Sequence, residues 1–386
     1  MKKANKCTQS VIGAYGEWAA NLVGQGPALL SFRNPEFKSV DTWRTDARAK
    51  MAELLAAPQD VWQPKAKVEE SVIHDGLKFE RLSWQLPYGA RTAAVFIKPA
   101  NAKGRLPAVL GLHDHAGNKY FGYRKIVRLP ERQHTLMRAH QKHYYEGAAW
   151  ANELARRGYG VLVHDAFAFG SRRVLFDDVP KNVAAGNTEP KNPEAPSRIK
   201  IYNEWAAKHA HTLAKSLFCA GTTWPGVFLY EDQKALDYLC TRNDVDVERI
   251  GCAGLSGGGL RTVMLAGMDD RIKVAVPVGF MSTWRDFLLY KSHTHTWMRY
   301  VPLLPRYLDF PEVLGLRAPL PTLVLNDSDD ALYTPEGMHE ADNILREVYK
   351  KAGAPQNYVC SFHPGPHKFD KPMQEEAFAW FDKWLR

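Results

Sequence analysis

The chain has 386 residues, of which 45% are hydrophobic and 24% charged, a balance that excludes disordered and fibrous proteins. It exceeds the roughly 250–300 residues at which one core stops growing, so we expect either two domains or one large domain with insertions. The net charge is +9. Because lysine and arginine are scattered and form no block of five or six, this charge predicts a basic surface and no nucleic-acid partner.

The cysteines and the apolar runs indicate in which cellular compartment the protein is expected. Five cysteines occur without a C-x-x-C pair, which argues against a zinc ribbon, a thioredoxin-type motif and a disulfide framework. No apolar run is long enough for a signal peptide or a membrane span. We therefore expect a cytoplasmic protein with no membrane partner, although a chain from which a signal had been trimmed would look the same.

The first part of the chain differs in pattern from the rest. Residues 1–70 are predicted to form a mostly helical arm, since A-R-A-K-M-A-E-L-L-A-A at 47–57 is rich in good helix formers. Two candidate strands follow at 77–86 and 92–97, separated by the turn signal P-Y-G. The remainder, residues 71–386, is predicted to be the catalytic domain.

From residue 107 onward, strand-like and helix-like segments alternate. Apolar runs predict strands at 107–112, 160–164, 250–254, 272–278, 322–325 and 358–362. Helices are predicted at 147–157, 227–239 and 260–266, after Thr334, and at the C-terminus. This alternation predicts an α/β fold with a mostly parallel sheet and helices on both faces.

Two stretches interrupt the alternation. Residues 166–225 have a polar centre rich in proline and asparagine, and residues 281–318 are aromatic and irregular. Connections of this length in a compact domain are usually functional lids or disordered segments. We expect lid-like insertions at both places. Within the first, Arg172 is expected to pair with a carboxylate and hold the insertion.

The sharpest motif is G-L-S-G-G at 254–258, which lies between a predicted strand and a predicted helix. A G-x-S-x-G sequence in that context is typical of a nucleophile elbow, where a strained turn presents the serine hydroxyl above the sheet. Neighbours without a Cβ allow such a turn. A phosphate-binding loop is the alternative, but its G-x-x-x-x-G-K-[ST] and G-x-G-x-x-G patterns are absent here. Ser256 is therefore predicted to be a nucleophile.

A serine nucleophile needs a base that a third group holds in place. Hydrolases with this elbow carry an acid and then a histidine farther along the chain. N-D-S-D-D at 326–330 and H-P-G-P-H at 363–367 follow predicted strands in that order. Such stretches are also common turn material, but their order and their place at strand ends favour a catalytic triad.

These motifs together resemble the α/β-hydrolase superfamily, in particular the branch of acetyl xylan esterases and dienelactone-hydrolase-like proteins. The resemblance covers roughly residues 70–386 and includes the elbow, D-D-R-I-K-V-A-V after it, and the acid and histidine loops. The branch's G-x-x-D pattern implies Asp329 as the acid, with Asp330 second and Asp327 third. Its P-G-x-H-like sequence implies His367 as the base.

An oxyanion hole requires two backbone N–H groups. One is expected from Gly257, the residue after the nucleophile. The second is expected from L-H-D-H-A-G at 112–117, which resembles the family's H-G-x-x-G and implies the amide of His115. Here Asp114 stands where the family has glycine.

Pairs of histidines also allow a metal interpretation, because H-x-H at a strand end begins the ligand set of several metallohydrolases. After His113 and His115, however, the aspartate and histidine of the H-x-H-x-D-H pattern are missing. The H-x-H sequences ending at His211 and His295 are interpreted as surface or lid histidines. We predict no metal and no cofactor.

The predicted function is hydrolysis of carboxylic esters through an acyl-enzyme, with a small-molecule or carbohydrate ester as the substrate class that the resemblance implies. Aromatic residues including Trp224 and Trp284 are expected either to line the substrate pocket or to pack the lid. Two alternatives remain: a serine peptidase of the prolyl-oligopeptidase type, and a non-catalytic binding protein on the same scaffold. The sequence makes no prediction about oligomeric state.

Overall fold

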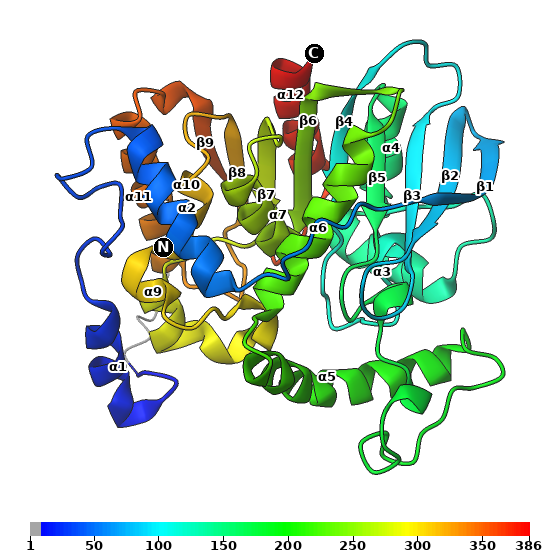
Figure 1. The fold of residues 1–386 in the computed structure, drawn as a ribbon, viewed down its shortest axis with the longest axis horizontal. Coiled ribbons are helices and arrows are strands. Elements are labelled where there is room, and N and C mark those ends of the chain that lie inside the picture. The colour runs from blue at the N-terminus through cyan, green and yellow to red at the C-terminus, as the bar shows by residue number, and fades with distance from the viewer. Residues whose placement is uncertain (1–8) are drawn as a thin grey trace.

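A twisted nine-stranded sheet forms the centre of residues 9–386, the part of the chain that the computed structural model describes (Figure 1). The strand order is β1-β2-β3-β5-β4-β6-β7-β8-β9. The strands are β1 (Lys67–His74), β2 (Leu77–Trp84), β3 (Thr92–Pro99), β4 (Leu106–Gly111), β5 (Gly160–His164), β6 (Val245–Leu255), β7 (Val274–Val278), β8 (Thr322–Asp327) and β9 (Tyr358–His363).

The sheet has an antiparallel edge and a parallel centre. The first three strands pair antiparallel, and β3 pairs antiparallel with β5. From β5 through β4 and β6 to β9 every pairing is parallel. The carboxyl ends of β4, β6, β8 and β9 therefore meet at one edge, where open parallel sheets place their ligands.

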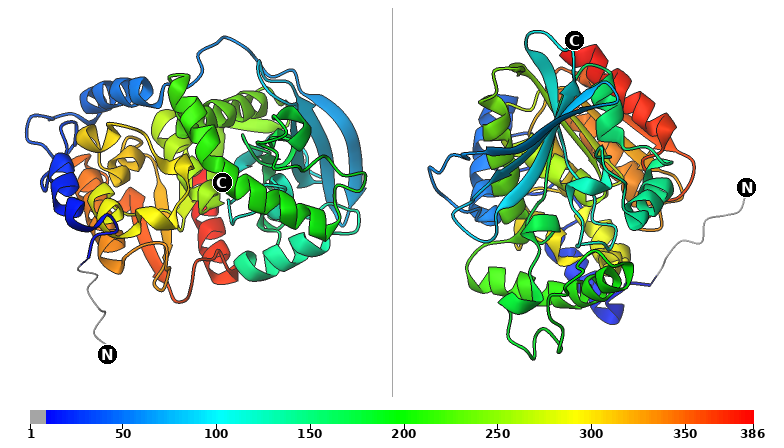
Figure 2. Two further views of the ribbon diagram at one scale, coloured as in Figure 1. Left: turned by 90° about the horizontal axis from the view of Figure 1, so that it is seen from below. Right: turned by 90° about the vertical axis from the view of Figure 1, so that its right-hand side faces the viewer.

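Helices cover both faces of this sheet (Figure 2). The α-helices of the described residues are α1 (Gly16–Val23), α2 (Val40–Leu55), α3 (Thr135–Tyr145), α4 (Trp150–Arg156), α5 (Pro196–Cys219), α6 (Trp224–Cys240), α7 (Gly257–Met268), α8 (Trp284–Asp286), α9 (Leu304–Tyr307), α10 (Phe310–Gly315), α11 (Pro335–Lys351) and α12 (Lys371–Leu385). Residues of α2, α6, α7, α10 and α11 join one hydrophobic cluster, and those of α4 and α12 join another. Alternating residues of the central strands feed the two clusters, as Leu110 and Val109 of β4 do.

The predicted α/β architecture is confirmed, and the buried strands lie close to their predicted positions. The segment predicted at 160–164 is β5 with the same bounds, and all five of its residues are buried. By contrast, β1 was not predicted, since seven of its eight residues are exposed and it carries no apolar alternation. This strand begins before residue 71, so the sheet extends into the predicted arm; residues 1–8 of that arm lie outside the described residues.

Both predicted insertions are ordered segments beside the carboxyl edge of the sheet. The 24-residue helix α5 lies in the first, next to the segment of residues 281–318 (Figure 1). The predicted pairing of Arg172 is confirmed, because its guanidinium lies 2.6 Å from a Glu231 carboxylate oxygen on α6. In the described chain, no helix combines the length and the apolar character that crossing a membrane requires.

Candidate active site

Ser256 lies in a strained turn between β6 and α7. Its φ of 57° and ψ of −116° are unfavourable for a residue with a Cβ, and its amide donates to the carbonyl of Val278 over 2.9 Å. The turn packs too tightly for larger neighbours. A Cβ at Gly254 would lie 2.3 Å from the carbonyl oxygen of Leu112, and one at Gly258 would lie 2.0 Å from it. These contacts explain why glycines flank the serine.

His367 follows β9 and reaches the same pocket as Ser256. Its Nδ1 lies 2.6 Å from Oδ2 of Asp330, a residue that is only 3% exposed. A carboxylate can only accept, so Nδ1 carries the proton and Nε2 is left as an acceptor. That Nε2 is buried and has no hydrogen-bond partner within residues 9–386. The imidazole is thus oriented on one side and free to take a proton on the other.

The three aspartates after β8 have different partners, and the expectation that Asp329 orients His367 is corrected. Asp330 holds the imidazole, whereas Asp329 is exposed and accepts the Gly365 amide over 3.0 Å. Asp327 accepts the amide of Lys368 over 3.0 Å, and burial raises its pKa to about 7. The acid in contact with the histidine is therefore the residue that the sequence ranked second.

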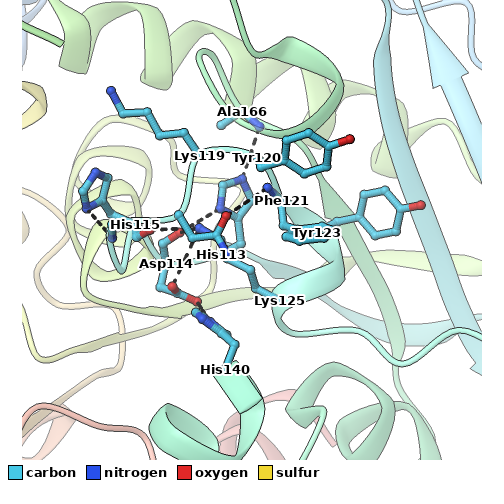
Figure 3. A network of polar contacts seen from close by, with 12 residues as sticks. His113, Asp114, His115, Lys119, Tyr120, Phe121, Tyr123, Lys125, His140 and Ala166 are labelled. Carbon is cyan, nitrogen blue, oxygen red and sulfur yellow. Dashed lines mark hydrogen bonds and ion pairs between the residues drawn. The ribbon is translucent and has the colours of Figure 1, made fainter. Parts of the chain in front are cut away.

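The backbone of His115 lies directly beside the elbow. A Cβ added to Gly257 would be 3.1 Å from the backbone nitrogen of His115, and both residues line the pocket with Ser256. Lys125 fixes this loop from behind, because its buried ammonium donates to the carbonyls of Asp114 over 2.7 Å and His115 over 3.0 Å (Figure 3). The structure thus places the backbone nitrogen of His115 beside Gly257, while the role of the two amides as an oxyanion hole stays a prediction.

Asp114, which stands where the resembled family has glycine, is the centre of a buried polar network. Its Oδ2 accepts from the Tyr145 hydroxyl over 2.5 Å. The same oxygen lies 3.1 Å from Nε2 of His140 (Figure 3). Burial alone would raise the pKa of Asp114, but His140 and Lys125 outweigh it and hold that pKa well below its usual range. Burial lowers the pKa of Lys125 to about 8. Oδ1 of Asp114 has no hydrogen-bond partner among the described residues, and the Lys125 ammonium lies 3.8 Å from it. The contacts of Oδ2 and of Lys125 thus hold the loop above the network in place.

The imidazoles of His113 and His115 do not converge on a common point. His113 is buried and accepts the amide of Ala166, while His115 accepts that of Gly117 (Figure 3). Within residues 9–386, one group of three ligand-type side chains has its atoms within 4.8 Å of one another: Asp327, Asp330 and His367. Two members of that group already form the acid–histidine pair described above.

A cavity of about 440 Å³ joins these elements, a size typical of small-molecule sites. Its walls include Ser256, His367 and, from the second insertion, His295 and Arg299. His295 was predicted to be a surface or lid residue; it lies in the second insertion and lines the cavity, where burial lowers its pKa to about 2. Burial also lowers the pKa of His115, to about 3.

The two tryptophans suggested as pocket residues are found elsewhere. Trp224 and Trp284 are 1% and 5% exposed, belong to the hydrophobic core and are not among the cavity's lining residues. Trp224 packs against Phe167 and Phe228. The expectation that they line the pocket is therefore corrected in favour of the packing alternative.

Comparison with known proteins agrees with this geometry. The model of the prolyl oligopeptidase family matches residues 221–307, which include the elbow. A protein of Bacillus subtilis (strain 168) described as "Putative hydrolase YtaP" is 29% identical over 298 residues, which cover 76% of this chain and 84% of that protein.

Solved structures match over most of their length. A structure described as a "putative acetyl xylan esterase" from Bacteroides fragilis has a TM-score of 0.67 at 17% identity, covering 92% of this chain and 85% of that one. A glucuronoyl esterase from Solibacter usitatus has a TM-score of 0.61 at 15% identity, covering 93% and 98%. The chain has the α/β-hydrolase fold. The predicted resemblance is confirmed for the fold, and the family match and the relative from Bacillus subtilis support a hydrolase.

Some residues of this α/β-hydrolase site carried no usable signal in the sequence. Lys125 and His140 lie 11 and 26 residues after Asp114, and no motif links them to it. Arg299 stands in the aromatic stretch W-M-R-Y, where a lone charged residue is the sign that could have marked it. Its partners, or their lack, are visible only in three dimensions.

Proposed function

We propose that this α/β-hydrolase cleaves carboxylic esters through a covalent acyl-enzyme on Ser256. The observation that carries the proposal is the state of His367 in the Ser256 pocket: Asp330 holds its Nδ1, and its buried Nε2 has no partner among the described residues. Such an imidazole is prepared to accept a proton from a nucleophile.

The chemistry follows from these roles. His367 Nε2 takes the hydroxyl proton of Ser256 as its oxygen attacks the ester carbonyl, and the amides of Gly257 and His115 stabilise the oxyanion. The imidazolium, stabilised by Asp330, then gives its proton to the leaving alcohol. A water molecule activated by the same histidine releases the acid and restores Ser256.

The substrate class rests on the neighbours. Esterases of carbohydrate esters are among the solved structures with this fold, and a cavity of about 440 Å³ has room for a small acyl or sugar group. A small carboxylic ester, including acetylated carbohydrates, is therefore the proposed substrate. The match to the prolyl oligopeptidase family makes a serine peptidase the second candidate.

The test is turnover of p-nitrophenyl esters of different acyl lengths, acetylated sugars and peptide amides by wild type and Ser256→Ala. We expect ester hydrolysis that the variant loses while it keeps its fold. Ser328→Ala is the matched control, because Ser328 is an exposed serine on the acid loop. Ester turnover retained by Ser256→Ala would overturn the mechanism, and faster cleavage of amides than of esters would favour the peptidase.

A further inference from the structure

Four arginines in residues 9–386 are buried, and one of them differs from the rest. Arg172 pairs with Glu231, and Arg261 pairs with Asp232 over 2.5 Å. Arg317 donates to backbone carbonyls, including that of Leu320 over 2.9 Å. Arg299 has 0% exposure, and its Nε, Nη1 and Nη2 all lack a hydrogen-bond partner among the described residues.

Aromatic rings account for only part of this environment. The guanidinium carbon of Arg299 lies 3.9 to 5.1 Å from the ring centroids of Phe287, Phe310, Trp284 and Phe280. The faces of such rings attract a cation, so they lower the cost of burying the charge. They offer no lone pairs to the N–H groups at the edge of the guanidinium plane, and a buried donor left unpaired is costly. The rings thus offset part of the cost of burying the charge, but the guanidinium N–H groups still lack a hydrogen-bond acceptor.

Arg299 belongs to the wall of the cavity that holds Ser256 and His367. We propose that it binds a carboxylate of the substrate, so that the preferred substrates are esters whose acyl or alcohol part carries one negative charge. This proposal rests on the ester hydrolysis proposed above and adds the charge of the substrate. A guanidinium presents a planar fork that matches a carboxylate in two parallel hydrogen bonds.

The charges around the cavity favour a monoanion over a dianion such as phosphate. His115 and His295 are neutral near pH 7, because burial lowers the pKa of each to about 3 and about 2. Lys368, which also lines the cavity, is engaged by Asp370 over 2.5 Å.

Two carboxylates also line the cavity: Asp330, which is paired with His367, and Asp329, which accepts the Gly365 amide. The guanidinium of Arg299 therefore remains as the cation without a polar partner among the described lining lysines and arginines.

Entry of a carboxylate requires a small movement, because water does not reach the guanidinium in this structure. The second insertion is suited to it. Around Arg299 the chain is built of single turns, Phe287–Lys291, Ser292–Thr294 and Trp297–Arg299, rather than of a continuous helix. Opening there breaks no continuous helix, but it moves Met298, which packs in the hydrophobic core.

The kinetic test compares matched anionic and neutral esters. In the acyl arm, 4-nitrophenyl hydrogen glutarate is compared with 4-nitrophenyl pentanoate; in the alcohol arm, acetoxyacetate is compared with its methyl ester. We expect kcat/KM to favour the anion in at least one arm by about tenfold or more, as a charge-assisted hydrogen bond would give. Arg299→Met should remove most of that ratio and Arg299→Lys only part. Arg306→Met, which removes an exposed charge from the same segment, should leave the ratio unchanged.

A binding measurement separates this inference from the proposed function. Titration of Ser256→Ala with monomethyl glutarate and with neutral dimethyl glutarate needs no turnover, and we expect binding of the monoanion that Arg299→Met in the same background weakens about tenfold or more. Equal kcat/KM and equal affinity for the anionic and the neutral ester would overturn the carboxylate site. Hydrolysis that depends on Ser256 would still support the proposed function. Tighter binding of inorganic phosphate than of the monoanion would overturn the carboxylate site as well. If Arg299→Met fails to fold, the wild-type ratios and Arg299→Lys still decide.

Discussion

The two walls of the cavity are built on different principles. The strand-end wall holds Asp330 and His367, which are joined through Nδ1 over 2.6 Å on loops fixed by parallel strands, so that the imidazole is oriented and Nε2 alone is unpaired. The wall from the second insertion holds Arg299, a fully buried cation with no hydrogen-bond partner among the described residues. Groups that already have partners inside the protein orient a reaction, whereas a group that lacks one is prepared for a partner from outside. Each of the following predictions probes one side of this contrast.

The largest effect is expected on the strand-end wall. Asp330→Asn should lower kcat by about 10⁴, the size seen for the comparable change in a serine protease, because the imidazole loses the partner that fixes its tautomer. Asp329→Asn should change kcat far less, since the residue contacts Gly365 and not His367. Steady-state kinetics of both single variants and the double variant checks this. A crippled Asp329→Asn beside a near-normal Asp330→Asn would reverse the assignment.

The next effect concerns stability and compares two buried arginines. Arg261→Met removes the guanidinium from buried Asp232 and leaves it the His164 imidazole at 2.9 Å, and should lower the free energy of unfolding by about 3–5 kcal/mol. Arg299→Met leaves no buried carboxylate without an ion-pair partner, so its free energy of unfolding should stay within about 1 kcal/mol of wild type or rise. Urea unfolding measures both. An equally large loss of unfolding free energy for Arg299→Met would mean that the guanidinium stabilises the fold and is not a site for a ligand.

The smallest effect tests whether His295 is neutral. Its folded pKa of about 2 lies below the ordinary 6.5, so only the unfolded chain takes up this proton as pH falls. The resulting stability is present above pH 6.5 and lost as pH falls toward the folded value, by at most about 1.4 kcal/mol per pH unit. Urea unfolding between pH 6.5 and 4.5 should show a shallower decline for His295→Gln than for wild type. Parallel curves would indicate a histidine that is charged in the folded pocket, and the monoanion argument would lose its basis.

The same contrast explains what the sequence could predict. Strands buried on both faces, such as β5, and the glycine-flanked Ser256 are recognisable because burial and turn strain restrict which residues fit. The acid was placed one residue early because the turn after β8, which decides which aspartate meets His367, leaves no mark in the spacing of the residues. The roles of Lys125 and Arg299 depend on contacts between distant segments, or on their absence, and no local pattern encodes these.

The central claim is that Ser256 forms a covalent bond with its substrate, and peptide mapping after reaction with a fluorophosphonate tests it most directly. A serine activated by His367 should be phosphonylated, and mass spectrometry should locate one adduct on the peptide that contains Ser256. Ser256→Ala should take up no label under the same conditions. An adduct on any other residue of wild type, or a labelled Ser256→Ala variant, would contradict the account.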